Sequence, residues 1–152
     1  MTSAPAMGPT SDLAGEATSV LAELAGPEAT LRPDQLAAIE ALVSARERVL
    51  LVQATGWGKS AVYWISTVLQ RRSGAGPTLV VSPLLALMRN QVAAAERAGI
   101  RAATINWANL EEWGEIEALI AADRVDVLLI SPERLNNPRF RAEVLPALAA
   151  RV

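Results

Sequence analysis

Eight consecutive residues, Gln53 to Ser60, carry the side chains best suited to chemistry in this chain. They read Gln-Ala-Thr-Gly-Trp-Gly-Lys-Ser, and Lys59 is the sole lysine beside thirteen arginines. Gly56 and Gly58 would let backbone N–H groups approach an anion without a Cβ in the way. The ammonium of Lys59 then suits the β- and γ-phosphates of a nucleotide, and the Ser60 hydroxyl suits Mg²⁺. The pattern predicts a phosphate-binding loop.

Such a loop follows a strand and precedes a helix. The apolar run Val49–Val52 predicts a buried strand, and Ser60–Gln70 predicts a helix whose positive dipole end points at the same anion. Further along the chain, the apolar spacing changes repeatedly between the strand and the helix repeat. It predicts strands over 78–81, 100–105 and 125–130, and helices over 11–25, from 33 onward, and over 84–97, 110–122 and 140–150. This alternation is typical of an α/β fold with a parallel sheet and helices on both faces.

The length and composition of the chain limit the number of domains it can form. The 152 residues suit one domain, and residues 1–10 have the composition of a disordered tail. We divide residues 11–152 into N-terminal helices over 11–45 and a part over 46–152 that contains the loop. Because the chain has no Cys and no His, disulfides, Cys/His zinc sites and Ser-His-Asp triads are excluded.

The sequence shows no targeting or membrane signal. No apolar run approaches the roughly 18 residues of a membrane helix, and the first residues lack the pattern of a signal peptide. We therefore expect a cytoplasmic protein with no membrane partner. The net charge of −2 means that any nucleic-acid binding has to come from local contacts.

The loop departs from the strict phosphate-loop pattern at one position. The strict phosphate-loop pattern begins with glycine, where this chain has Gln53. The plain alternative is a glycine-rich turn that happens to carry a lysine. The expected strand before the loop, the helix after it and the uniqueness of Lys59 favour nucleotide binding.

Four blocks resemble those of the RecQ family of superfamily 2 helicases, in the same order. Leu31–Gln35 resembles the adenine-recognition motif, and Thr55–Ser60 resembles motif I. Val80–Gln91 closely resembles motif Ia, and Leu129–Leu135 resembles the segment before the D-E-A-H box. The first loop position of this family is often not glycine, so Gln53 fits. The blocks span most of the chain.

The resemblance implies a RecA-like P-loop NTPase fold that binds ATP and Mg²⁺ in an ATP-dependent 3′→5′ DNA helicase. It implies a catalytic role for Lys59, a metal contact for Ser60, and an amide on Gln35 that matches N6 and N7 of adenine. The implied ATP-binding residues are Arg32, Gln35, Thr55, Gly56, Trp57, Gly58, Lys59 and Ser60. The implied nucleic-acid contacts, mostly to phosphates of a single strand, are Ser82, Arg89, Gln91, Asn106 and Ser131.

The sequence departs from the family near its C-terminus. The D-E-A-H block supplies an aspartate for Mg²⁺ and a glutamate for the attacking water, and no Asp-Glu dipeptide occurs here. Glu133 is displaced from that position by Ser131-Pro132. We expect a fold truncated before the DEAH strand, without the C-terminal helicase domain, and negligible ATP hydrolysis by this chain alone. The missing strand is expected to deprive part of Val125–Ile130 of a neighbour and to cause marginal stability or self-association.

Alternatives remain for the function and for single residues. One is another P-loop enzyme, such as a nucleotide or small-molecule kinase. Another is a non-enzymatic chain that binds nucleotide or DNA and regulates an intact helicase. Gln35 and Arg89 have the alternative of solvated helix residues, and Ser82 that of a strand-to-helix cap. For the tryptophans packing is favoured over base stacking: Trp57, Trp64, Trp107 and Trp113.

Overall fold

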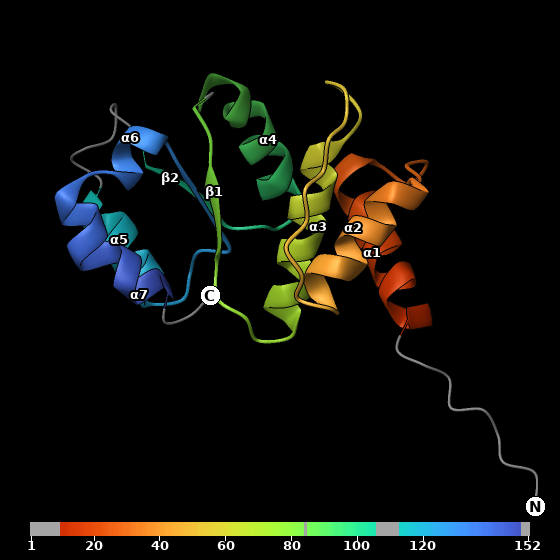
Figure 1. Cartoon of the computed structure of the whole chain (residues 1–152), viewed down its shortest axis with the longest axis horizontal. Coiled ribbons are helices and arrows are strands. Elements are labelled where there is room, and N and C mark those ends of the chain that lie inside the picture. The colour runs from red at the N-terminus through yellow and green to blue at the C-terminus, as the bar shows by residue number, and fades with distance from the viewer. Residues whose placement is uncertain (1–9, 84, 106–112, 150–152) are drawn as a thin grey trace, which may run out of the picture. The chain divides into compact units, whose positions relative to one another are not determined.

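A computed structural model of the chain describes residues 10–83, 85–105 and 113–149 (Figure 1). The chain falls into two compact units, which divide between Leu69 and Gln70. This division lies inside a helix. The subdivision of one domain into residues 11–45 and 46–152 stays a prediction. The predicted tail over 1–10 lies outside the described residues, except for Thr10, which starts the first helix. None of the described helices is long and apolar enough to span a membrane.

Three helices build the first unit. α1 spans Thr10–Ala25, α2 spans Pro33–Val43, and α3 spans Lys59–Arg72 and continues into the second unit. Pro33 occupies the first turn of α2, where its missing N–H costs nothing. Apolar side chains at helical spacing on the three helices form one core, made of Ala17, Val20, Leu21, Ala38, Ile39, Val62, Ile65 and Leu69.

The predicted strand over 49–52 is not formed. Leu51 packs against the core of the first unit, whereas Leu50 and Val52 are 89% and 78% exposed. The alternation of a strand is therefore present. A strand also needs ladder hydrogen bonds to a neighbouring strand, and no described strand pairs with this segment. The prediction was wrong because a local apolar pattern does not supply a pairing partner.

A parallel sheet of three strands forms the centre of the second unit. β1 spans Thr78–Val81, β2 spans Ala102–Ile105, and β3 spans Val127–Ile130. Their order is β1-β3-β2, so β3 pairs with a neighbour on each side. All four β3 residues are fully buried, as expected for a continuous apolar run in a parallel sheet. The three strands that the sequence predicted here are confirmed.

The central place of β3 corrects an expectation. We expected part of Val125–Ile130 to lack a neighbour, but β3 is paired on both sides. Among the described strands, the edges that remain belong to β1 and β2. The physical reason is the strand order, because an edge falls on the outermost strands whichever segment comes last in sequence.

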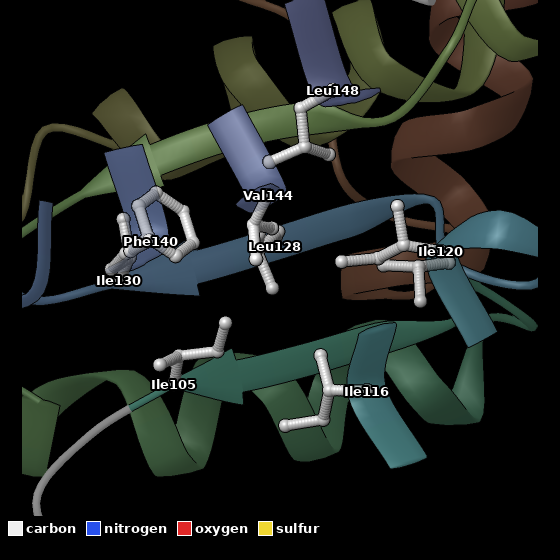
Figure 2. Packing of buried hydrophobic residues seen from close by; sticks show 9 residues of the cluster. Ile105, Ile116, Ile120, Leu128, Ile130, Phe140, Val144 and Leu148 are labelled. Atoms are coloured by element: carbon white, nitrogen blue, oxygen red, sulfur yellow. The ribbon is translucent and has the colours of Figure 1, made fainter. Parts of the chain in front are cut away.

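Helices cover both faces of this sheet. α5 (Trp113–Ala121), η2 (Phe140–Val144) and α7 (Leu145–Ala149) lie on one face, where Figure 2 shows their apolar side chains against the strands. α4 (Leu85–Arg97) lies on the other side (Figure 1), and the short α6 (Pro132–Leu135) follows β3. The helix predicted over 140–150 thus begins as one π-helical turn. The core on the α5 face contains Ile105, Ile116, Ile120, Val125, Leu128, Ile130, Phe140, Val144 and Leu148.

An ion network joins the segments at the starts of the strands. Arg71 Nε donates to Oδ1 of Asp126 across 2.9 Å, and Nη2 of Arg101 donates to the same oxygen across 2.6 Å. Arg71 also pairs with Asp123 at 3.0 Å. Burial opposes ionisation of Asp126, but the hydrogen bonds from Arg101 and Arg71 outweigh it and lower its pKa to about 2. All four residues belong to the second unit, where the network holds together the segments that precede its strands.

Candidate functional site

The loop before α3 has the backbone geometry that a phosphate site needs. Gly56 has φ +81° and Gly58 has φ +100°, a region that side chains rarely adopt. The N–H of Trp57 donates to the carbonyl of Ala54 across 3.3 Å, which closes a turn. Lys59 and Ser60 are the first two residues of α3. The positive end of a helix of 14 residues therefore follows two left-handed glycines, as the sequence predicted.

Lys59 bonds back onto the start of its own loop. Its Nζ donates to the carbonyl oxygen of Gln53 across 2.6 Å and to that of Ala54 across 2.8 Å. We call this pair of contacts the lysine clasp. Sequence reasoning missed the two acceptors, because backbone carbonyls are present at every position and carry no signal of their own. The clasp holds the positive charge of the Lys59 ammonium beside Gln53 and Ala54, at the start of the loop.

Gln35 connects the start of α2 to the same loop. Its Nε2 donates to the carbonyl of Gly58 across 3.1 Å, and its Oε1 accepts from the N–H of Arg32 across 2.9 Å. The residue is only 5% exposed, so the alternative of a solvated helix residue does not hold. A Cβ on Gly58 would lie 2.7 Å from Nε2 of Gln35, so the Gln35 amide would have to shift to accommodate any other residue. The structure thus joins Arg32, Gln35 and Gly58, three of the predicted ATP-binding residues.

The two tryptophans whose side chains the structure describes, Trp57 and Trp64, pack against other residues. Trp57 is half-buried and packs against the core of the first unit. Trp64 is buried, and its ring centroid lies 5.1 Å from that of Tyr63. Burial raises the pKa of Tyr63 to about 12. The packing interpretation therefore holds for Trp57 and Trp64. Trp107 and the side chain of Trp113 lie outside the described residues.

The predicted nucleic-acid residues follow the carboxyl ends of the strands. Ser82 comes directly after β1 and Ser131 directly after β3, and the N–H of Ser82 donates to the carbonyl of Ile130 across 3.0 Å. These two residues therefore share one edge of the sheet, which is where ligands of open parallel sheets bind. Ser131 is only 2% exposed, and Arg89 is exposed on α4. Asn106, next in sequence after β2, and the side chain of Gln91 lie outside the described residues.

The two predicted groups occupy different units. The ATP-binding set from Arg32 to Ser60 lies in the first unit, and the nucleic-acid set lies in the second. Sequence reasoning did not anticipate the ion network of Arg71 and Asp126, because residues 55 positions apart give no joint signal.

The loop residues fit a nucleotide phosphate. The site offers exposed backbone at Thr55 and Gly56, a primary ammonium on Lys59 and a hydroxyl on Ser60, all of which are donors. Nothing lies within 4 Å of the position of a Cβ on Gly56, so the loop is open there. For Mg²⁺ this part of the chain supplies only the Ser60 hydroxyl, and no group of three or more acidic residues with metal-site geometry occurs among the described residues. That fits an ion held largely by phosphates and water.

The sequence was compared with known families and proteins. Residues 32–147 match the DEAD/DEAH box helicase family. The chain is 37% identical over 126 residues to the ATP-dependent DNA helicase RecQ of Bacillus subtilis, covering 82% of this chain and 20% of that protein. It is 33% identical over 125 residues to the RecQ helicase of Haemophilus influenzae, covering 82% and 19%. A putative ATP-dependent DNA helicase Q1 of Caenorhabditis briggsae is 36% identical over 112 residues, covering 71% and 17%.

These matches distinguish a helicase from another P-loop enzyme, such as a kinase. The chain spans at most 20% of the length of these relatives, but the family match covers most of the chain. It includes nearly all of the block that resembles the adenine motif, the block that resembles motif I, and the segment after β3. The kinase alternative is thereby excluded, and the three-stranded parallel sheet with helices on both faces is that of a RecA-like P-loop fold. The chain belongs to the DEAD/DEAH box helicases and, within them, to the RecQ family.

Proposed function

We propose that this chain binds Mg-ATP at the loop from Gln53 to Ser60 and single-stranded nucleic acid at the carboxyl edge of the sheet. The observation that carries the proposal is the start of α3, where Lys59 and Ser60 directly follow two glycines with positive φ. The whole protein is proposed to be an ATP-dependent DNA helicase that unwinds in the 3′→5′ direction. The names of the RecQ relatives support an ATP-dependent DNA helicase, whereas the 3′→5′ direction rests on the resemblance of the sequence blocks alone.

Each loop residue has a physical task in nucleotide binding. The N–H groups around Gly56 and Gly58 and the helix end point partial positive charge at an anion. Lys59 supplies a full charge that exchanges neutral carbonyl acceptors for charged phosphate oxygens, which are stronger partners. The Ser60 hydroxyl would hold Mg²⁺, which neutralises charge on the phosphates when bound. Arg32 and Gln35 would contact the adenine.

The nucleic-acid part rests on the second unit. Ser82 and Ser131 lie at one sheet edge, and the exposed guanidinium of Arg89 stands on the helix that follows β1. Hydroxyls, backbone N–H groups and arginine are typical phosphate contacts, and they carry no sequence information. The burial of Ser131 indicates that its contact would be made through its backbone or after a local rearrangement.

ATP hydrolysis is proposed to need the aspartate and the glutamate of a D-E-A-H block. The chain has no Asp-Glu dipeptide that could supply them. The chain alone is therefore proposed to bind Mg-ATP with negligible turnover, and the helicase cycle to require the C-terminal helicase domain as partner. Turnover that is stimulated by DNA and abolished in Lys59→Ala would refute this part. A regulatory role of the isolated chain has no observation of its own in its favour.

A thermal melt tests nucleotide binding. Mg-ATP at 100 times its Kd should add about 2.7 kcal/mol to the stability of the folded chain, which is a shift of about 5–10 °C for a domain of this size. Lys59→Ala should abolish the shift. Arg72→Ala removes an exposed cation at the other end of α3 and should retain it. An unchanged melt of the wild-type chain in saturating Mg-ATP would contradict the proposal.

Binding of a labelled single-stranded oligonucleotide tests the second part. Affinity should fall as the salt concentration rises, because phosphate contacts release counterions. Arg89→Ala should weaken binding and reduce the slope of this salt dependence by about one ion. Arg141→Ala, which removes an exposed arginine on η2, serves as the matched control. Equal effects of both substitutions would place the nucleic acid elsewhere.

A further inference from the structure

Trp57 is a large aromatic residue between the two glycines of the loop. It lies between Gly56 and Gly58, whose φ angles are +81° and +100°. Of the loop residues 53–60, Trp57 alone packs against the apolar core of the first unit. Ala54 and Thr55, earlier in the loop, are exposed. A large indole is thus directed from the loop into the body of the unit, while the two residues beside it carry no side chain.

We propose that Trp57 is a positioning residue, which fixes the loop against the core and so preorganises the backbone N–H groups for phosphate. The effect on nucleotide affinity rests on the proposed function, whereas the effect on loop order does not. A segment with two glycines has more backbone freedom than a segment of the same length without glycine, and it loses more of it when an anion is bound. An indole contributes a large apolar contact area with few rotatable bonds, so it restrains this segment before the nucleotide arrives.

Three side-chain hydrogen bonds hold the two ends of the same loop and leave its central turn to Trp57. Gln35 bonds the carbonyl of Gly58 at the end of the loop, and the lysine clasp bonds the carbonyls of Gln53 and Ala54 at its start. The turn between these ends is closed by one backbone bond of 3.3 Å from Trp57 N to Ala54 O. The indole is the contact that holds this turn from the core side.

The experiment compares the wild-type chain with Trp57→Ala, Trp57→Phe and Leu24→Ala. Leu24 packs against the same core from α1, far from the loop in sequence, so its truncation is a matched control for lost packing. Backbone order parameters of residues 55–58 are measured by nitrogen-15 relaxation without nucleotide. Mg-ATP affinity and the melting temperature are then measured for each variant.

The wild-type loop should have order parameters of about 0.85, and Trp57→Ala should lower them below about 0.6. Mg-ATP affinity should fall by about tenfold in Trp57→Ala, and Trp57→Phe should restore most of both values. Leu24→Ala should lower the melting temperature and change neither loop order nor affinity. Unchanged order parameters in Trp57→Ala would overturn the inference, as would an equal loss of affinity in Leu24→Ala.

The two possible failures are distinguishable. If the wild-type chain does not bind Mg-ATP, the proposed function fails for this chain, but the order parameters still decide whether Trp57 holds the loop. If Mg-ATP binds with equal affinity to the wild type and to Trp57→Ala, the proposed function stands and the positioning role is refuted.

Discussion

The side-chain amide of Gln35 donates a hydrogen bond across 3.1 Å to the backbone carbonyl of Gly58, a residue 23 positions further along the chain. The same side chain accepts from the N–H of Arg32. A residue with an implied role in adenine recognition is therefore in direct contact with the loop that is implied to bind the phosphates. Because of this contact, a Cβ at position 58 would displace the Gln35 amide.

Gly58→Ala should destabilise the chain more than Gly56→Ala. Both positions have positive φ, which costs a residue with a Cβ about 1–2 kcal/mol. At Gly58 the new Cβ also meets Nε2 of Gln35 at 2.7 Å, whereas at Gly56 it meets nothing within 4 Å. Urea unfolding should therefore show an additional loss of about 1–3 kcal/mol for Gly58→Ala.

The double variant Gln35→Ala/Gly58→Ala separates the clash from the strain. Removing the amide relieves the close approach, so the combined loss should be smaller than the sum of the two single losses. Gln35→Ala alone should cost about 1–3 kcal/mol, because buried groups lose their partners. Strict additivity would show that Gln35 and Gly58 do not interact.

The lysine clasp should be visible directly, because Lys59 is the only lysine. A sample labelled with nitrogen-15 lysine should have one Nζ resonance. Without nucleotide its ammonium hydrogens should exchange with water about tenfold more slowly than in the urea-unfolded chain, since two carbonyls hold them. Saturating Mg-ATP should move the resonance. Exchange as fast as in the unfolded chain would disprove the clasp.

Asp126 should make the free energy of unfolding fall at acidic pH. Its pKa is lowered from an ordinary value of 3.8 to about 2, so the folded state favours the ionised carboxylate. The resulting stabilisation is fully present above about pH 4 and is lost as the pH falls through the folded pKa near 2. It amounts to about 2 kcal/mol, since one pKa unit corresponds to roughly 1.4 kcal/mol.

Urea unfolding between pH 2 and 5 tests this dependence. Asp126→Asn should be less stable than the wild type at pH 5 and should lack most of the decline towards pH 2. Glu28→Gln changes an exposed carboxylate and should retain the wild-type decline. A decline of wild-type size in Asp126→Asn would assign the acid sensitivity to another group.

The exposed side chains of Leu50 and Val52 should promote self-association. They lie on a segment without a ladder partner among the described strands, and exposed apolar residues with unpaired backbone groups favour pairing with another chain. Sedimentation velocity should show concentration-dependent association of the wild type that Leu50→Lys/Val52→Lys reduces by about tenfold. Leu119→Lys, at an apolar residue of α5 that is 37% exposed, is the control. A monodisperse wild type that melts cooperatively at high temperature would argue against this expectation.

The sequence by itself determined the local features. The strands β1, β2 and β3 and the main helices follow from apolar spacing, since burial of one face requires that spacing whatever the neighbours are. The turn around Gly56 and Gly58 follows from residues that tolerate positive φ. Placement of Ser82 and Ser131 at one sheet edge follows from parallel pairing, which brings the carboxyl ends of strands together.

The tertiary structure decided what depends on distant partners. Only the strand order shows that β3 is central and paired on both sides. Residues 49–52 form no strand because none of the described strands offers them a pairing partner. The bond from Gln35 to Gly58 and the bond from Arg71 to Asp126 join positions whose separation in sequence carries no signal. The lysine clasp uses backbone carbonyls, which every residue has, so the folded path of the chain alone selects Gln53 and Ala54 as its acceptors.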